Sequence, residues 1–405
     1  MKILEINKFN YLRRGAEKHF LDLASLLKEN GNEVAIFSMD NPRNDFSPWK
    51  KYFVSYVGFG PEDSWKDKLK GLFRIYSFEA KRKIGKLLDD FRPDVVHIHN
   101  IYHHISPSIL GEIKKRKIPI VMTVHDYNLI CPNYTLSSGG KDWEELGEEK
   151  RFWNFVRGKY FKDSYLQSFL AYLEFAFNRY FRFYEKSVDA YIAPSVFVGK
   201  KLVAGGIPAE KIIVLPHFAK NDLEGASCDL RNRKKYAFYF GSISKEKNIP
   251  QLIEIFKDLP EVDLYLAGNL ESGLQLPKAG NIRYLGFLNQ LEIEKTIRNS
   301  MFVVSPSRLP ETFGLIALEA IKNGKPFIGF DAGAYGEIIE NNKHGYLCKS
   351  QEEMREKILQ LATDEGLRIL FSRYALERAA DFSSNRYYRE LMDIFRSQAE
   401  RKERD

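Results

Sequence analysis

Short apolar runs alternate along this chain with longer amphipathic stretches. Runs at 2–6, 33–37, 95–99 and 119–124 are typical of strands, and the stretch 19–29 between the first two is typical of an amphipathic helix. A second series of strands is expected at 236–240, 262–268, 282–285, 302–304 and 326–329. Alternating strands and helices predict βαβ units with parallel sheets. We therefore expect an α/β protein built from two doubly wound domains of similar size.

The boundary between these domains is expected in a polar stretch that lacks periodicity. It follows an apolar run at 211–215 and contains Gly, Asn, Asp and Lys residues, which favour an irregular connection. We assign residues 1–216 to the first domain, 217–235 to a linker and 236–380 to the second domain.

Two segments, 65–88 and 152–184, combine basic residues with many apolar and aromatic ones. Two interpretations stay open for them. Basic amphipathic stretches can lie in the interface of an anionic membrane, and they can equally form a solvated helix face over a domain core.

Composition restricts the class of protein. The chain has 405 residues, 44% hydrophobic and 29% charged, which fits a globular protein with two or three cores and excludes a disordered or fibrous chain. Its net charge of +8 favours an anionic partner. The three cysteines form no Cys-x-x-Cys pair, so we expect no disulfide framework and no thiolate zinc site. An acid at Glu5 interrupts the first apolar run, so we expect no signal peptide and a cytoplasmic protein.

The most informative segment is a loop that leads into a helix. The strand at 302–304 ends in a Pro-containing loop, and residues 315–322 have the composition of a helix that stops at Asn323-Gly324. Backbone N–H groups at such a helix start attract anions, and here they belong to Thr312, Phe313, Gly314 and Leu315. One acid, Glu311, precedes the helix, and a second, Glu319, lies inside it.

Taken singly, Glu311 and Glu319 would be a solvated loop acid and an exposed helix position. Together they are two acids separated by seven residues, with Phe-Gly after the first and Leu-Glu-Ala around the second. This pattern resembles the retaining nucleotide-sugar glycosyltransferases of family 4. The resemblance implies the GT-B fold, in which two Rossmann-like domains face each other across a cleft, and a C-terminal helix at 381–405 that packs back on the N-terminal domain.

The resemblance extends over nearly the whole chain. Residues 324–329, 333–339 and 344–347 resemble the family's continuation after the second acid, and residues 240–248 resemble the loop after the first strand of its nucleotide domain. There the resemblance implies that Lys247 binds the diphosphate. Ser242 stands where the family usually carries Arg, and Asn248 where it carries Gly, so one of two expected positive contacts is missing or is supplied from elsewhere.

The N-terminal half carries two shorter matches. Arg14-Gly15-Ala16-Glu17 resembles the family's glycine-rich loop, which implies that backbone N–H groups of Gly15 and Ala16 approach a phosphate, although an ordinary strand-to-helix turn would look the same. Thr123-Val124-His125-Asp126 resembles the family's His-Asp element. It implies that His125 hydrogen-bonds the donor sugar.

Histidines raise the question of a metal. His97, His99, His103, His104 and His125 lie near two strand ends, but no carboxylate or cysteine is spaced to close a coordination shell. We expect His97 and His99, which alternate on one strand face, to be polar residues at the rim of a cleft. Because the sequence also lacks an Asp-x-Asp clamp, we expect no metal and no cofactor.

These features predict a hexosyltransferase that moves a hexose, with retention, from a UDP- or GDP-sugar to a polysaccharide or lipid-linked acceptor. The resemblance implies that Glu311 contacts the transferred sugar and Glu319 the ribose, in a setting of bacterial polysaccharide biosynthesis and with peripheral attachment to an anionic membrane as an option. One alternative is a GT-B protein that binds a nucleotide sugar without transferring it, which Ser242 keeps open. A polyanion- or nucleic-acid-binding protein is disfavoured, because the basic residues are dispersed and the known motifs are absent.

Overall fold

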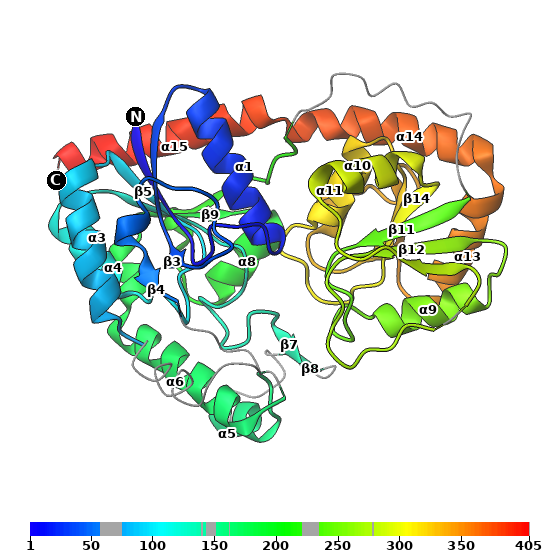
Figure 1. The fold of residues 1–405 in the computed structure, drawn as a ribbon, viewed down its shortest axis with the longest axis horizontal. Helices are drawn as coiled ribbons and strands as arrows, with labels where there is room; N and C mark the ends of the chain where they lie inside the picture. Colours follow the sequence, from blue (N-terminus) through cyan, green and yellow to red (C-terminus); the bar gives the residue numbers. More distant parts are fainter. Residues whose placement is uncertain are drawn as a thin grey trace. The chain divides into compact units, whose positions relative to one another are not determined.

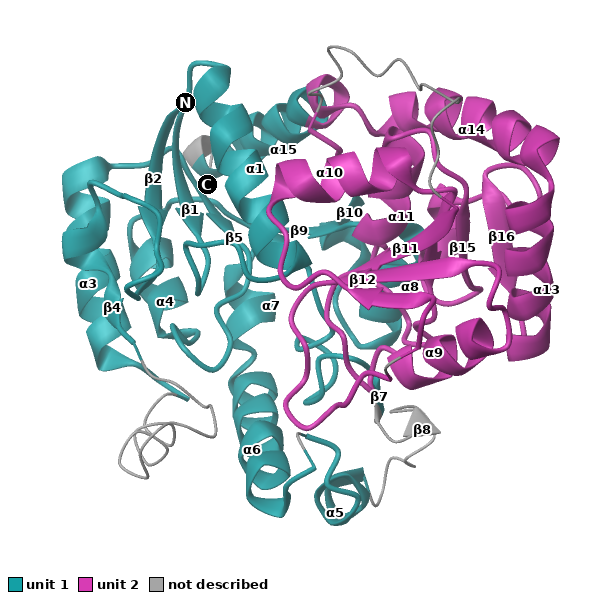
Figure 2. Ribbon diagram, turned by 45° about the vertical axis from the view of Figure 1, so that its right-hand side comes forward, with its two compact units in different colours: residues 1–215, 388–405 teal, residues 216–387 magenta. Residues whose placement is uncertain are grey.

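The chain divides into two compact units (Figure 2). The computed structural model describes residues 1–56, 75–138, 141–142, 151–161, 163–220, 235–277 and 279–404. Unit 1 comprises Met1–Leu215 with Tyr388–Asp405, and unit 2 comprises Pro216–Tyr387. Most of the predicted linker, residues 221–234, and the predicted helical positions 65–74 lie outside the described residues.

Unit 1 is built on a 6-stranded parallel sheet with the order β10-β9-β6-β5-β1-β2 (Figure 1). Its strands are β1 (Lys2–Ile6), β2 (Glu33–Phe37), β5 (Val95–Ile98), β6 (Ile120–Thr123), β9 (Ala190–Ala193) and β10 (Ile212–Val214). After β2 the sheet grows from the other side of β1. The boundary between β1 and β5 is therefore the point where a doubly wound sheet places its ligands.

Helices cover both faces of this sheet, because strands buried on both sides need a layer on each. The helices of unit 1 are α1 (Gly15–Glu29), α3 (Phe78–Phe91), α4 (Ser108–Lys115), α5 (Arg151–Arg157), α6 (Tyr165–Phe181), α7 (Phe183–Ser187), α8 (Val196–Ala204) and most of α15 (Ser384–Arg404). Short elements complete the unit: the strand pairs β3 (Met39–Asp40) with β4 (Val54–Ser55) and β7 (Ser137–Ser138) with β8 (Lys141–Asp142), and the 3-10 turns η1 (Lys50–Tyr52) and η4 (Ala209–Lys211).

The C-terminal helix α15 packs on unit 1, as expected. The hydroxyl of Tyr388 accepts a hydrogen bond from Asn32 Nδ2 at 3.0 Å, and the ring of Phe395 lies edge-on to His97 with centroids 5.3 Å apart. Lys402 pairs with Asp189 at 3.0 Å. The end of the chain therefore completes the fold of the unit in which the chain begins.

Unit 2 repeats the architecture with a second 6-stranded parallel sheet, in the order β13-β12-β11-β14-β15-β16. Its strands are β11 (Tyr236–Phe240), β12 (Asp263–Ala267), β13 (Ile282–Tyr284), β14 (Phe302–Ser305), β15 (Phe327–Phe330) and β16 (Gly345–Cys348). Its helices are α9 (Ile249–Lys257), α10 (Gln290–Asn299), α11 (Leu315–Lys322), α12 (Tyr335–Ile338), α13 (Gln351–Thr363) and α14 (Glu365–Ala379), with the 3-10 turn η5 (Ala380–Phe382). The predicted pair of doubly wound units is thus confirmed. The order in which strands are added reverses between β11 and β14 in this sheet, as it does between β1 and β5 in unit 1, and we call each of these places the reversal point of its sheet.

Among the residues that the structure describes, no helix is both long enough and apolar enough to cross a bilayer.

Candidate functional site

The predicted nucleotide-binding groups of unit 2 collect at the reversal point of its sheet. Lys247 lies in the loop that follows β11, and Glu311 in the loop that follows β14. Because β11 and β14 are neighbouring parallel strands, their carboxyl ends lie at the same edge. Lys247 and Glu311, 64 positions apart along the chain, therefore meet in an ion pair.

The carboxylate of Glu311 is held in place by several neighbours. Its Oε1 accepts hydrogen bonds from Lys247 Nζ and, at 2.9 Å, from Ser307 Oγ. Burial raises the pKa of Tyr239 and of Tyr335, and the charge of Glu311 raises both further. Glu311 is thus a fixed negative charge, with a cation on one side and two buried tyrosines near it.

Asn248 explains one departure from the family pattern. Its backbone has φ +61°, in the left-handed region that glycine adopts most easily and asparagine better than most other residues. Its side-chain amide donates to the carbonyl oxygen of Pro306 at 3.1 Å. Asn248 therefore keeps the backbone turn that a glycine would provide and adds a tie between the two loops.

Two glycines allow the Glu311 loop to take its path. Gly314, at φ +100°, is the N-cap of α11, and a Cβ there would lie 2.6 Å from the ring of Tyr335. A Cβ on Gly333 would lie 2.3 Å from both the backbone nitrogen and the backbone oxygen of Glu311. Any side chain at Gly333 would thus displace the residue that carries the acid.

The remaining predicted donor-binding residues occupy different environments. Glu319 is only 4% exposed within α11, and Phe313 is buried with its ring edge-on to His217. The ring of Phe313 is therefore a core group, and a role for Thr312, Phe313, Gly314 and Leu315 would have to rest on their backbone N–H groups. Ser242 accepts a hydrogen bond at its carbonyl from Tyr239 Oη, at 2.7 Å.

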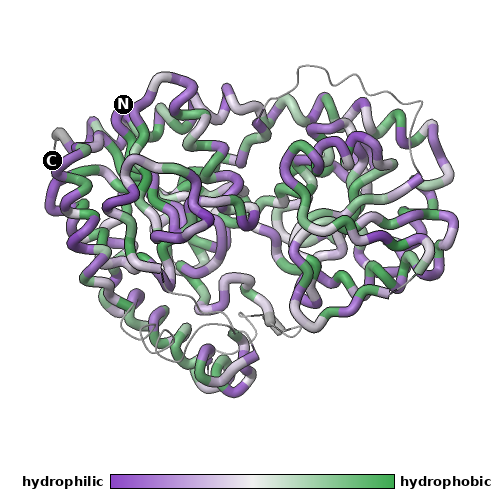
Figure 3. Tube along the Cα trace, in the orientation of Figure 1, coloured by the Kyte–Doolittle hydropathy of each residue, from purple (hydrophilic) through white to green (hydrophobic). Residues whose placement is uncertain are grey.

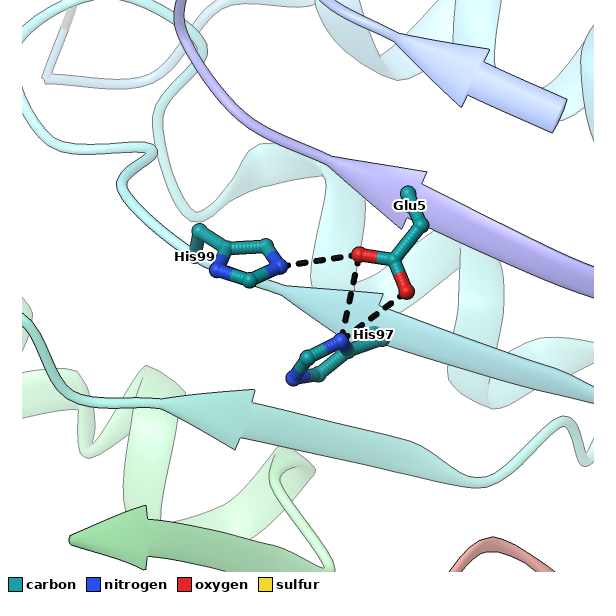
Figure 4. A group of neighbouring side chains, drawn as sticks. All are labelled: Glu5, His97 and His99. Atoms are coloured by element: carbon teal, nitrogen blue, oxygen red, sulfur yellow. Dashed lines mark hydrogen bonds and ion pairs between the residues drawn. The ribbon is translucent and has the colours of Figure 1, made fainter. Parts of the chain in front are cut away.

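In unit 1 a buried polar cluster occupies the reversal point between β1 and β5 (Figure 4). Glu5 lies on β1, and His97 and His99 lie on and just after β5. His97 Nδ1 lies 3.0 and 3.1 Å from the two oxygens of Glu5, and His99 Nε2 lies 2.8 Å from Glu5 Oε2. All three side chains are 0% exposed, so the expectation that His97 and His99 line the rim of a cleft is wrong.

Two further bonds connect this cluster to the end of β6. His97 Nε2 lies 2.8 Å from Thr123 Oγ1, and His99 Nδ1 lies 2.7 Å from Nε2 of His125. The rings of His99 and His125 are stacked, with centroids 5.0 Å apart. The predicted sugar-binding residue His125 is thus attached to a buried carboxylate through one intervening histidine.

The charges of this cluster follow from its burial and its pairing. Burial by itself raises the pKa of Glu5, but His97 and His99 outweigh it and lower that pKa to about 2. Burial lowers the pKa of His99 to about 4, with His97 acting in the same direction and Glu5 opposing it. At neutral pH Glu5 is therefore ionised and His99 is neutral.

Glu5 is the residue that sequence reasoning missed. It supplies a carboxylate to His97 and His99 from 92 and 94 positions away, so no spacing rule would connect them. Donor atoms of these three residues lie within 4.8 Å of one another, which is a composition that could hold a metal ion. The sequence signal that could have found Glu5 is an acid in the middle of an apolar strand whose two faces are covered, because a buried charge needs partners.

His103, another histidine of the predicted set, lies outside this cluster and pairs with Glu174 of α6 at 2.5 Å.

Gly15 and Ala16 are the first two residues of α1, rather than part of a loop before the helix as the resemblance implied. Arg14 is the N-cap, and its backbone N–H donates to Glu17 Oε2 at 3.1 Å. Burial raises the pKa of Glu17, and the cations Lys8, Arg13 and Arg14 act in the opposite direction. Three cations therefore lie close enough to act on the carboxyl of Glu17 in the first turn of α1.

Comparison with known proteins extends these findings. Residues 13–220 match the family model described as Glycosyltransferase Family 4, and residues 225–378 match the one described as Glycosyl transferases group 1. A protein in the cps region of Klebsiella pneumoniae is 23% identical over 92% of this chain and 96% of its own. The sulfoquinovosyl transferase SQD2 of Arabidopsis thaliana is 24% identical over 72% of this chain and 54% of its own.

Solved structures show the same fold. Sucrose-phosphate synthase from Thermosynechococcus elongatus superposes with a TM-score of 0.71 at 15% identity, covering 98% of both chains. HepE from Anabaena, in complex with UDP and glucose, gives a TM-score of 0.67 at 17% identity, covering 98% of this chain and 100% of its own. Since one family model covers half of the chain and the fold agrees throughout, this protein belongs to glycosyltransferase family 4 and is a glycosyltransferase of the GT-B fold.

Proposed function

We propose that this protein is a retaining glycosyltransferase that moves a hexose from a UDP- or GDP-sugar to a polysaccharide or lipid-linked acceptor. The observation that carries the proposal is the pairing of Lys247 with Glu311 at the carboxyl ends of β11 and β14. A cation for a diphosphate and an acid for a sugar meet where a doubly wound sheet binds its ligand. Cations and helix starts are the groups that stabilise a departing diphosphate.

In this proposal each group has one task. Lys247 and the start of α11 stabilise charge on the leaving diphosphate, and the start of α1 at Gly15 and Ala16 contributes further N–H groups. Glu311 faces the transferred sugar where positive charge develops, while Glu319 accepts hydrogen bonds from the ribose. An oxygen of the departing diphosphate takes the proton of the acceptor, so no side chain is required as a base.

Because Ser242 stands where the family usually carries Arg, the proposed diphosphate site has one cation fewer than the family pattern. If Lys247 and the start of α11 do not suffice for transfer, the protein would bind a nucleotide sugar without transferring it. Detection of released nucleoside diphosphate separates these two functions.

The relatives support the choice of substrates. The Klebsiella relative is named for a cps region, SQD2 is named a sulfoquinovosyl transferase, and HepE was solved with UDP and glucose. We therefore propose a nucleotide sugar as donor and a growing saccharide as acceptor.

Turnover should not require a divalent metal. With UDP- or GDP-hexoses and a saccharide or lipid-linked acceptor, we expect release of nucleoside diphosphate to continue in excess chelator, because Lys247 and backbone N–H groups carry the leaving-group charge. A coupled assay for the diphosphate, with and without chelator, measures this. Activity lost in chelator and restored by Mg²⁺ or Mn²⁺ would contradict the metal-independent mechanism, and no turnover with any donor would contradict the enzyme.

Attachment to an anionic membrane is a second expectation, and helix α6 supports it. Hydrophobic and hydrophilic positions alternate along α6 (Figure 3). Its large exposed apolar side chains are Tyr165, Leu166, Phe169, Leu173, Tyr180 and Phe181. Basic residues Arg179 and Arg182 lie at its C-terminal end. Such a surface suits an interface with acidic lipids.

Vesicle sedimentation tests this surface. We expect binding to anionic vesicles that weakens with salt, and that weakens further when Leu166 and Tyr180, which are 67% and 82% exposed, are changed to Ser. Leu291→Ser is the matched control, because Leu291 is 75% exposed on α10 of unit 2. Equal binding by all variants, or none to either anionic or neutral vesicles, would identify α6 as a solvated helix.

A further inference from the structure

A continuous line of hydrogen bonds runs from Glu5 through His99 to His125. Glu5 Oε2 lies 2.8 Å from His99 Nε2, and His99 Nδ1 lies 2.7 Å from His125 Nε2 (Figure 4 shows the first of these bonds). Glu5 and His99 are completely buried. The rings of His97, His19, Phe20 and His125 pack around the ring of His99.

The positions of the protons along this line follow from its buried end. An ionised Glu5 can only accept, so His99 must donate from Nε2. A neutral His99 has a single ring proton, so its Nδ1 accepts. The partner of that nitrogen, Nε2 of His125, must therefore donate. In a neutral His125 the lone pair then lies on Nδ1.

We propose that Glu5 and His99 are positioning residues that keep the proton of His125 on Nε2 and so present Nδ1 as the acceptor for a hydroxyl of the transferred sugar. The contact with the sugar rests on the proposed function, whereas the position of the proton does not. A carboxylate that fixes the tautomer of a histidine through its second ring nitrogen is a known way to orient that ring.

Glu5, His97 and His99 have a composition that suits a metal ion, but their contacts are better explained by hydrogen bonds than by a bound metal. Both nitrogens of His97 and both nitrogens of His99 have a hydrogen-bonding partner, as do both oxygens of Glu5. A proton in each of these contacts satisfies every donor and acceptor. A bound metal is the competing outcome of the test.

The cluster contains its own control residue. His97 is as deeply buried as His99 and bonds to the same carboxylate. Its second nitrogen, however, meets Thr123 rather than His125. Replacing either histidine by glutamine should disturb packing to a similar extent, but only His99→Gln breaks the line to His125.

Nitrogen NMR of histidine-labelled protein near pH 7 measures the tautomer directly. We expect His125, assigned by its loss in His125→Gln, to carry its proton on Nε2 in the wild type and to lose this preference in His99→Gln but not in His97→Gln. With the donor that turns over best, we expect kcat to fall about 10-fold in His99→Gln, while His97→Gln stays within about twofold. Loss of the group that orients a metal-bound histidine typically costs about 10-fold to 100-fold, and we expect the lower end of that range for a histidine that binds a sugar. The affinity for free nucleoside diphosphate should be unchanged in both.

Several results would overturn the proposal. They are a wild-type His125 protonated on Nδ1, stoichiometric zinc that is released by His99→Gln, and equal losses in the two glutamine variants. The wild-type spectrum requires no substitution, so it decides the tautomer even if His99→Gln does not fold. Failure of the proposed function would appear differently, as the expected tautomer in a wild-type protein that transfers no sugar.

Discussion

Replacing Glu311 by alanine is expected to lower turnover by about 100-fold to 1,000-fold, or roughly 2.7–4 kcal/mol. The fixed carboxylate is proposed to face the sugar where positive charge develops, so its removal affects the transition state more than the ground state. Affinity for free nucleoside diphosphate should stay the same or rise slightly, because Lys247 loses its acidic partner and keeps its charge for the diphosphate. Initial rates beside calorimetry with the diphosphate measure both effects.

Glu340→Ala is the control for this variant. Glu340 also forms an ion pair, with Lys343 at 2.9 Å, but this pair is more exposed and joins two residues three positions apart, outside the loops that follow β11 and β14. Its loss should leave turnover unchanged. If Glu311→Ala weakened the diphosphate and preserved turnover, the proposed assignment of Glu311 to the sugar would be wrong.

Replacing Glu319 by alanine should instead weaken free nucleotide and nucleotide sugar alike, by about 1.5–3 kcal/mol, the range for hydrogen bonds to a charged group. Glu319 is proposed to hold the ribose, which is the same in substrate and product. Its removal should therefore weaken binding of the ground state and of the transition state by the same amount. Calorimetry with the nucleoside diphosphate should therefore detect it as clearly as the KM for the donor does.

The variant Glu294→Ala is a control that distinguishes a loss of nucleotide affinity from a loss of folding stability. Glu294, 6% exposed, pairs with the buried Lys322 of α11, the helix that also carries Glu319. Glu294→Ala should lower the free energy of unfolding, since it leaves a buried ammonium without that partner, but should not lower nucleotide affinity at temperatures where the variant is folded. Equal affinity losses in Glu319→Ala and Glu294→Ala would mean that Glu319 acts through the fold alone.

Most of the fold could be predicted, because local patterns mark its elements. Strands β1, β2 and β11 and helix α11 have the predicted bounds. Helix α11 was predictable since a Pro-containing loop precedes it and Asn323-Gly324 follows it. Helix α1 begins at Gly15, four residues before its predicted start, because its first turn contains no apolar stripe.

The candidate sites were predictable only in part. Lys247 and Glu311 could each be identified from their loops, but their ion pair depends on β11 and β14 being neighbours, which the order of elements along the chain does not state. Glu5 could not be connected with His97 and His99, because that contact also depends on the strand order. Local patterns predict elements, whereas the sheet determines which of their ends meet.

The pairing of β11 with β14 also connects the proposed ligand site with the course of folding. Lys247 and Glu311 are separated by 64 positions, which hold β12, β13 and the helices between them. Closing a loop of that length has an entropic cost that local contacts do not, so such contacts form late. A partly folded unit 2 that has paired only β11, β12 and β13 lacks Glu311 beside Lys247. If Lys247 and Glu311 bind the donor as proposed, nucleotide affinity should report that unit 2 has finished folding, whereas helix content should report only that folding has begun.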